Sequence, residues 1–192
     1  MRFLLISLAL LVSQTGWAAN QPRVSLETNK GTIVLELDQE KAPKTVANFL
    51  QYVEEGFYTN TIFHRVIRDF MIQGGGFTPK YERKNTRPPI VNEADNGLKN
   101  TRGTIAMART NEPNSATNQF FINTVNNPFL DYRSKTVSGW GYCVFGKGIE
   151  GMDVMDRISV VKTGAGGPFR SDVPVMPVMI NKVTLIDESK DK

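Results

Sequence analysis

Apolar and polar residues alternate along the first regular stretch of the chain. From Val24 to Thr28, and again from Ile33 to Leu37, every second position is apolar or threonine. Asn29-Lys30-Gly31 lies between the two runs and has the residue types of a tight turn. A period of two is typical of a strand with one buried face. Residues 23–38 are therefore predicted to form a β-hairpin.

A segment with helical spacing follows the hairpin. Pro43 fits the first turn of a helix, and Gly56 can take the left-handed conformation beyond the last turn. The apolar residues between them recur at i, i+3, i+4 and i+7, and they are Val46, Phe49, Leu50 and Val53. This spacing predicts an amphipathic helix with one buried face.

The rest of the chain holds short apolar runs separated by Gly, Pro and Asn. The clearest are Thr61 to Ile67, Phe70 to Gln73, Thr104 to Ala108, Gln119 to Asn123 and Cys143 to Gly146. Val178 to Ile186 is predicted as the closing strand, and Gly151 to Ile158 as a second helix with Met152, Met155 and Ile158 on one face. The pattern favours a mainly β fold, a closed eight-stranded antiparallel barrel capped by two α-helices. A sandwich of two sheets has the same periodicity and remains an alternative.

Two segments lack this regularity. Residues 78–102 and 109–118 are polar and rich in Asn, Pro and Arg. Long ordered loops in a compact domain often carry function, so we expect some of these residues near a site.

The N-terminus has the pattern of an export signal. Arg2 precedes the apolar run Phe3 to Val12, and small residues follow near Ala18. The run is about half the roughly 20 residues that a membrane-spanning helix needs, although an N-terminal anchor is the alternative. Residues 1–18 are predicted to be a removed signal peptide. Residues 19–192 are then a single exported domain with a short polar tail and without stable membrane association.

Charge and cysteine content exclude several classes of protein. The formal net charge is +4, and the Lys and Arg residues are interspersed, so no nucleic-acid partner is expected. Cys143 is the only cysteine and His64 the only histidine, which excludes an intramolecular disulfide and a Cys/His zinc site. Gly74-Gly75-Gly76 lacks the Lys-Ser/Thr of a phosphate-binding loop and is better explained by close backbone packing. We expect no metal and no cofactor.

No nucleophile is apparent in the sequence. A catalytic triad would need His64 as its base, but no Gly-x-Ser-x-Gly elbow is present. Cys143 lies in an apolar run and is expected to be an inert buried thiol. Glu93 and Asp95 are expected to support turns. A hydrolase that uses His64 is a remote hypothesis, and a satisfied structural histidine is the preferred interpretation.

Three segments combine apolar residues with Arg and Gln at unusual density. They are FHRVIRDFMIQGGGFT at 63–78, GTIAMART at 103–110 and NQFFIN at 118–123, the last followed by Phe129-Leu130. In these segments the chain resembles the cyclophilins, and among them the bacterial periplasmic type, from about Val24 to Leu185. The resemblance implies a peptidyl-prolyl cis/trans isomerase that acts on proline-containing polypeptides and assists the folding of exported proteins.

The resemblance also implies a set of site residues. Arg65 corresponds to the family's catalytic arginine. The positions that correspond to substrate-binding residues are Phe70, Met71, Gln73, Ala108, Gln119, Phe121, Phe129, Leu130 and Tyr142. Many eukaryotic members have tryptophan in place of Phe129 and histidine in place of Tyr142. That tryptophan helps to bind cyclosporin through its N–H, so weak cyclosporin binding is expected here.

An arginine with an apolar pocket suits the isomerisation of a prolyl bond. Rotation breaks the amide resonance, with a barrier of roughly 18–20 kcal/mol. The twisted nitrogen regains a lone pair, and a cation that donates a hydrogen bond to it stabilises the transition state without a nucleophile or base. The alternative is a binding module that grips proline-containing segments with little turnover. Nothing in the sequence indicates an obligate oligomer, so a monomer is expected.

Overall fold

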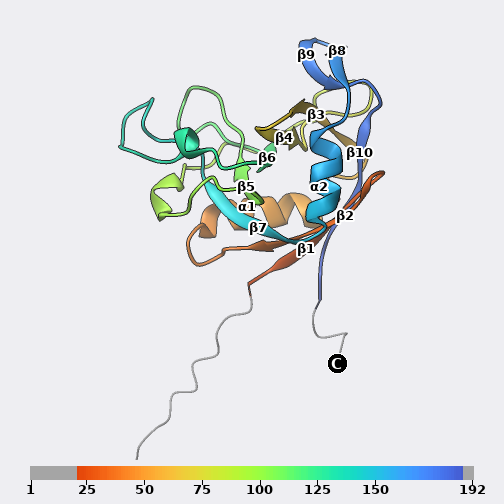
Figure 1. Cartoon of the computed structure of the whole chain (residues 1–192). Helices are drawn as coiled ribbons and strands as arrows, with labels where there is room; N and C mark the ends of the chain where they lie inside the picture. The colour runs from red at the N-terminus through yellow and green to blue at the C-terminus, as the bar shows by residue number, and fades with distance from the viewer. Residues whose placement is uncertain (1–20, 188–192) are drawn as a thin grey trace, which may run out of the picture.

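The computed structural model describes residues 21–187, so the predicted signal peptide and the last five residues of the tail lie outside the described range. Eight strands form a closed barrel in the order β1-β10-β3-β4-β6-β5-β7-β2 (Figure 1). Their bounds are β1 Arg23–Thr28, β2 Gly31–Leu37, β3 Thr61–Ile67, β4 Met71–Gly74, β5 Thr104–Met107, β6 Phe120–Asn123, β7 Val144–Glu150 and β10 Val178–Leu185. The predicted barrel is confirmed, and the alternative sandwich is wrong.

Every pair of neighbouring strands in the barrel is antiparallel, and the first strand closes it. β1 pairs with β2, with Leu26 opposite Ile33, and on its other edge with β10, with Leu26 opposite Val183. The predicted hairpin therefore forms, and its first strand, β1, also pairs with the last barrel strand, β10. Because closure leaves no free edge in the sheet, the barrel has no unpaired strand to protect.

Two helices contribute apolar faces to the interior. α1 spans Pro43–Glu54 and α2 spans Met152–Ser159, close to the predicted ranges. The buried face of α1 includes Val46 and Phe49, and Gly56 beyond its end has φ 63°, as its predicted role requires. Glu93 supports a local turn, since its carbonyl accepts the N–H of Asn96 over 3.1 Å. Its carboxylate has a second role, because it accepts the N–H groups of Lys44 (3.1 Å) and Thr45 (2.8 Å) and so caps α1.

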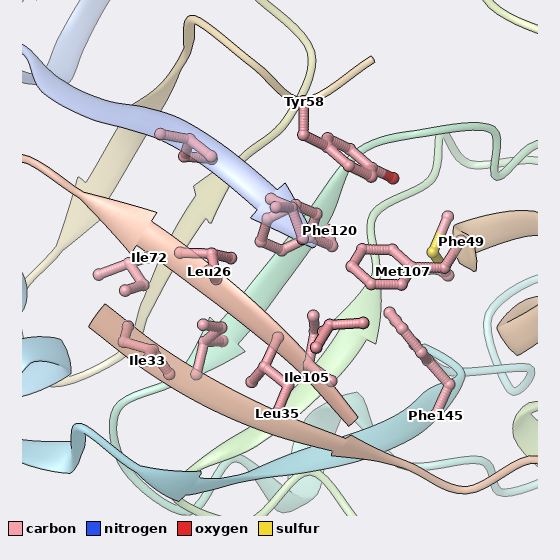
Figure 2. Close-up of a cluster of buried hydrophobic side chains, with 14 of the residues drawn as sticks. Leu26, Ile33, Leu35, Phe49, Tyr58, Ile72, Ile105, Met107, Phe120 and Phe145 are labelled. Atoms are coloured by element: carbon pink, nitrogen blue, oxygen red, sulfur yellow. The ribbon is translucent and has the colours of Figure 1, made fainter. Parts of the chain in front are cut away.

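The core is one continuous cluster inside the barrel. Figure 2 shows side chains of the strands and α1 meeting there, and the labelled residues are Leu26, Ile33, Leu35, Phe49, Tyr58, Ile72, Ile105, Met107, Phe120 and Phe145. Phe49 packs edge to face on Phe120 with ring centroids 5.7 Å apart. Alternation along the strands then leaves the intervening side chains on the outer face of the barrel.

One hairpin outside the barrel was not predicted. β8 (Thr163–Gly166) and β9 (Phe169–Pro174) form a separate two-stranded sheet, which stands next to β3 and α2 at the top of Figure 1. Short 3₁₀ turns at Ala94–Asn96 and Pro128–Leu130 interrupt the long loops.

Within residues 21–187 no helix has both the length and the apolar character needed to cross a membrane.

Candidate active site

A row of outward-facing side chains crosses four neighbouring strands of the barrel. Arg65 of β3 is the register partner of Gln73 on β4, Gln73 is opposite Phe121 on β6, and Phe121 is opposite Ala106 on β5. The order of strands in the barrel, which differs from their order in the sequence, therefore brings three separated motifs into one line. Ile72, Phe120 and Ile122 alternate with this row and point into the core.

The row borders a small cavity of about 110 Å³. Its lining consists of Arg65, Phe70, Met71, Gln73, Ala108, Arg109, Phe121, Leu130 and Tyr142. Seven of the nine substrate-binding residues expected from the resemblance are among them, together with Arg65. Met71, Phe121 and Leu130 are buried, and they belong to an apolar cluster on the outer face of the barrel that is distinct from the core. The cavity is therefore apolar on one side, with a guanidinium at its edge.

Arg65 is exposed, which suits a group that must meet a ligand. Its side chain is 44% exposed, and its Nε lies 4.0 Å from Oδ2 of Asp172 on β9. The neighbouring Gln73 is half-buried, and its Nε2 donates a hydrogen bond to Oε1 of Gln119 over 3.0 Å. Gln119 does not line the cavity itself but fixes the orientation of Gln73 beside it.

Phe129 also lies outside the lining. Its side chain is 63% exposed, and its ring stacks on Phe70 with centroids 5.6 Å apart. The two rings form an apolar rim at the edge of the cavity. Phe129 is therefore in contact with the site through Phe70 and not through the cavity wall.

Arg109 is a site residue that the sequence analysis missed. Its guanidinium lies over the ring of Tyr142, 4.7 Å from the centroid, and its Nε donates to the carbonyl of Gly141 over 2.9 Å. Tyr142 in turn meets Phe121 edge to face at 5.6 Å. Arg109 thus holds one wall of the cavity in place. Arg109 lies in the segment GTIAMART and at the start of loop 109–118, and both were singled out in the sequence, but neither pattern indicated a role for this residue.

A buried network of asparagines fixes the loop that carries Leu130. Nδ2 of Asn127 donates to Oδ1 of Asn123 over 2.7 Å and to the carbonyl of Phe70 over 3.0 Å. Asn100 donates through Nδ2 to the carbonyl of Leu130 over 3.2 Å. Because unpaired polar groups are costly in a buried setting, this network specifies one loop conformation. Sequence reasoning assigned these asparagines no role.

The three consecutive glycines pack closely, as predicted. A Cβ on Gly74 would lie 2.9 Å from the ring of Phe63, and one on Gly76 would lie 2.6 Å from the side chain of Gln119. Gly75 has φ 82°, a conformation that favours glycine. The glycines therefore allow Gln119 to reach Gln73.

A second cavity of about 160 Å³ adjoins the first and shares Gln73, Ala108 and Arg109 with it. Its other lining residues are Arg83, Thr110, Ser115, Thr117 and Gln119. Loop 109–118, expected to lie near a site, provides one side of it. A larger hollow of about 260 Å³ between β2, β5 and β7 contains Glu36 and Lys147, which pair with each other over 3.5 Å. We place the site at the first cavity because the exposed guanidinium of Arg65 lies there beside the buried apolar side chains of Met71, Phe121 and Leu130.

Neither Cys143 nor His64 offers a nucleophile or a base to this cavity. Burial raises the pKa of the Cys143 thiol to about 11, so the thiol stays protonated near neutral pH, in agreement with an inert residue. Burial, and next the charge of Arg65, lower the pKa of His64 to about 4, although a hydrogen bond with the backbone of Ile62 acts in the opposite direction. His64 is buried and does not line the cavity, in agreement with a structural histidine, but it is not fully satisfied, since its Nδ1 has no hydrogen-bond partner among residues 21–187.

Trp140 anchors the segment that connects Leu130 to Tyr142. Its ring meets Tyr132 edge to face at 5.6 Å, and the ammonium of Lys135 lies 6.0 Å from its centroid. Among residues 21–187, no group of three or more His, Cys, Asp or Glu side chains is arranged to hold a metal ion.

Comparisons with known proteins agree with this geometry. Residues 23–185 match the family model described as cyclophilin type peptidyl-prolyl cis-trans isomerase/CLD. The chain is 58% identical over 162 residues to peptidyl-prolyl cis-trans isomerase B of Escherichia coli, covering 84% of this chain and 98% of that protein. It is 52% identical over 169 residues to peptidyl-prolyl cis-trans isomerase A of Dickeya dadantii, covering 88% and 87%.

A solved structure with the same architecture is a Cryptosporidium parvum cyclophilin type peptidyl-prolyl cis-trans isomerase, crystallised in the presence of the dipeptide Ala-Pro. Its TM-score is 0.72 at 29% identity, with 86% of this chain and 99% of that chain covered. The matched residues contain every strand of the barrel and every residue of the cavity. The chain belongs to the cyclophilin family of peptidyl-prolyl cis-trans isomerases.

Proposed function

We propose that this protein accelerates rotation about X-Pro bonds by means of Arg65, which stabilises the twisted amide while the neighbouring cavity holds the proline ring. As a member of its family the chain is a peptidyl-prolyl cis-trans isomerase, and the proposal concerns how it acts. The observation that carries it is the exposed guanidinium at the edge of a small cavity with buried apolar walls.

The reaction needs no bond to be made or broken between heavy atoms. As the amide twists, the nitrogen lone pair leaves conjugation with the carbonyl and becomes a hydrogen-bond acceptor. An N–H of Arg65 donates to that nitrogen at the twisted geometry and loses this bond when the amide is planar again. Because the interaction exists only near the transition state, it lowers the barrier without tightening substrate binding. Arginine suits this role since it stays charged throughout.

The other cavity residues hold the substrate. Met71, Phe121 and Leu130 form the apolar surface for the proline ring, which is the main source of binding energy for an uncharged ring. The linked amides of Gln73 and Gln119 supply donors and acceptors for the polypeptide backbone on either side. Phe70 and Phe129 contact the chain beyond the proline.

We further propose that the enzyme works on exported proteins in the periplasm. The support is the charged and apolar pattern of residues 1–18, interpreted as a removed signal peptide, and the high identity to bacterial relatives. The mature domain would then begin near residue 19. We also propose that the enzyme acts as a monomer, because this chain by itself supplies both Arg65 and the apolar wall beside it.

The test compares Arg65→Ala with Arg68→Ala, an exposed arginine that follows the same strand but does not line the cavity. Loss of a preorganised donor typically costs about 10²- to 10³-fold in kcat, so we expect a fall of that size for Arg65→Ala and none for Arg68→Ala. Isomerisation of an X-Pro peptide is measured by NMR exchange, and peptide affinity by titration of the same variants. Unchanged activity in Arg65→Ala would refute the mechanism. Peptide affinity with negligible rate enhancement in the unmodified protein would instead identify a binding module.

A further inference from the structure

The hairpin β8–β9 lies outside the barrel, yet one of its side chains reaches the candidate active site. Asp172 on β9 places Oδ2 4.0 Å from Nε of Arg65, and both side chains remain partly exposed, at 37% and 44%. Within the described residues 21–187, Asp172 is the only ion-pair partner of Arg65. The contact involves Nε, so the two terminal nitrogens of the guanidinium remain available to a substrate.

The backbone at Asp172 adopts an uncommon conformation. Its φ is 66°, in the left-handed region that non-glycine residues seldom occupy. The register of β8 and β9 also shifts here: between the pairs Gly164–Val173 and Gly166–Phe169, β8 has one residue and β9 has three, so Asp172 lies in a bulge of β9. Bulges change the direction of a side chain, and strained backbone is often retained where a side chain has a function.

The hairpin is fixed against the strand that carries Arg65. Phe169, three residues before Asp172, packs on His64 at 5.4 Å and on Phe77 at 5.2 Å. His64 directly precedes Arg65 on β3. Val173, directly after Asp172, is buried. The carboxylate is therefore held between two anchored positions beside Arg65, and Figure 1 shows the hairpin standing over β3.

We propose that Asp172 is a positioning residue that holds the Arg65 guanidinium in the orientation needed at the twisted amide. This rests on the proposed function, because Asp172 has no contact with the substrate and acts only through Arg65. A long arginine side chain has many rotamers when it is exposed, and a fixed carboxylate reduces their number before the substrate arrives. The contribution should therefore affect kcat, and KM should change little.

The first measurement uses Asp172→Asn, which removes the charge but keeps a side chain that tolerates positive φ. An exposed ion pair contributes at most about 1 kcal/mol, so we expect kcat to fall about two- to fivefold with KM nearly unchanged. The matched control is Asp156→Asn, which breaks the exposed pair with Arg102, 2.7 Å apart, and neither of these residues lines the cavity. An unchanged kcat in Asp172→Asn, or an equal fall in the control, would overturn the proposal.

The dependence of kcat on salt concentration distinguishes an electrostatic role of Asp172 from a merely structural one. The Debye length is about 3 Å at 1 M ionic strength, shorter than the 4.0 Å separation of this exposed pair. The ratio of kcat between the unmodified protein and Asp172→Asn should therefore approach one as NaCl rises to about 1 M. A ratio independent of salt would contradict the proposal.

A variant with both Arg65 and Asp172 replaced distinguishes failure of this proposal from failure of the proposed function. Asp172→Asn should have no effect on residual exchange when Arg65 is already alanine, because the partner through which it acts is gone. A persistent effect would show that Asp172 supports the fold and not Arg65. Full activity of Arg65→Ala alone would refute the proposed function. An inactive Arg65→Ala with a fully active Asp172→Asn would refute only the positioning role.

Discussion

At the scale of single residues, the site depends on what surrounds ordinary side chains. An exposed arginine on a strand is usually a surface residue, and Arg65 differs only because Gln73 and Phe121 follow it across the sheet. The apolar cluster beneath them would be unusual on a free surface, since it gathers Met71 and Leu130 outside the core. The function that we propose for Arg65 thus depends on its neighbours in this row and not on the arginine alone.

Phe129 gives a direct prediction about inhibition. Its ring is exposed and stacked on Phe70, with no N–H to donate. Cyclosporin should therefore bind weakly, and Phe129→Trp should tighten binding by about five- to tenfold, the value of one added hydrogen bond of about 1 kcal/mol. Inhibition of isomerisation measures the affinity. Nanomolar inhibition of the unmodified protein would show that this position does not control cyclosporin binding.

The resemblance named most of the residues that line the candidate cavity, but it could not indicate the contacts that hold them in place. Arg109 was missed because its role depends on the path of the loop after β5, which turns the guanidinium back over Tyr142. No periodic pattern encodes that path. The asparagine network around Asn100 and Asn127 was missed for the same reason, since its members are far apart in the sequence and meet only in the fold.

At the scale of elements, the helices and strands predicted from the sequence match the observed ones where one face of the segment is buried in the barrel. The hairpin of β1 and β2 and the helix α1 follow their periods closely because alternation is enforced by one large core. Hairpin β8–β9 shows the limit of that reasoning. Residues 163–166 are Thr-Gly-Ala-Gly, without apolar alternation, and the hairpin is held by contacts of Phe169 with distant residues. Such tertiary contacts are invisible in a local window.

The packing beneath this hairpin predicts a pH dependence of stability. His64 is buried between Phe77 and Phe169, and its pKa is lowered from 6.5 to about 4. The unfolded chain therefore binds a proton more readily than the folded one, so this stability is present above pH 6.5 and is lost as the pH falls toward 4. The shift corresponds to about 2 kcal/mol between pH 7.5 and pH 5.

Urea unfolding at those two pH values checks this prediction. The unmodified protein should lose more stability on acidification than His64→Phe, whose ring fills the same aromatic site and carries no titrating group. The carboxylates of the chain titrate in both proteins, so the difference between the two losses isolates His64. Equal losses would show that protonation of His64 is not linked to unfolding.

At the scale of the whole molecule, the barrel separates stability from chemistry. Inner faces of the strands form the core, whereas the outer faces of β3, β4, β5 and β6 form the candidate site. Closure depends on the two ends of the chain, because β1 pairs with β10. The barrel can therefore be complete only when the last strand is in place, and most of its stabilising contacts join residues far apart in the sequence.

This separation predicts that a core variant loses stability and retains catalysis. Ile180 on β10 is fully buried and is the register partner of Thr61 on β3, the strand that carries Arg65. Ile180→Ala should lower the free energy of unfolding by about 2–5 kcal/mol, while the exposed Lys182→Ala on the same strand should change it by less than about 0.5 kcal/mol. Well below the unfolding temperature, kcat should remain within about twofold in both, because neither side chain faces the cavity and distant changes add independently. A large fall of kcat in folded Ile180→Ala would contradict this separation. It would show that packing inside the barrel affects the position of Arg65 on the outer face.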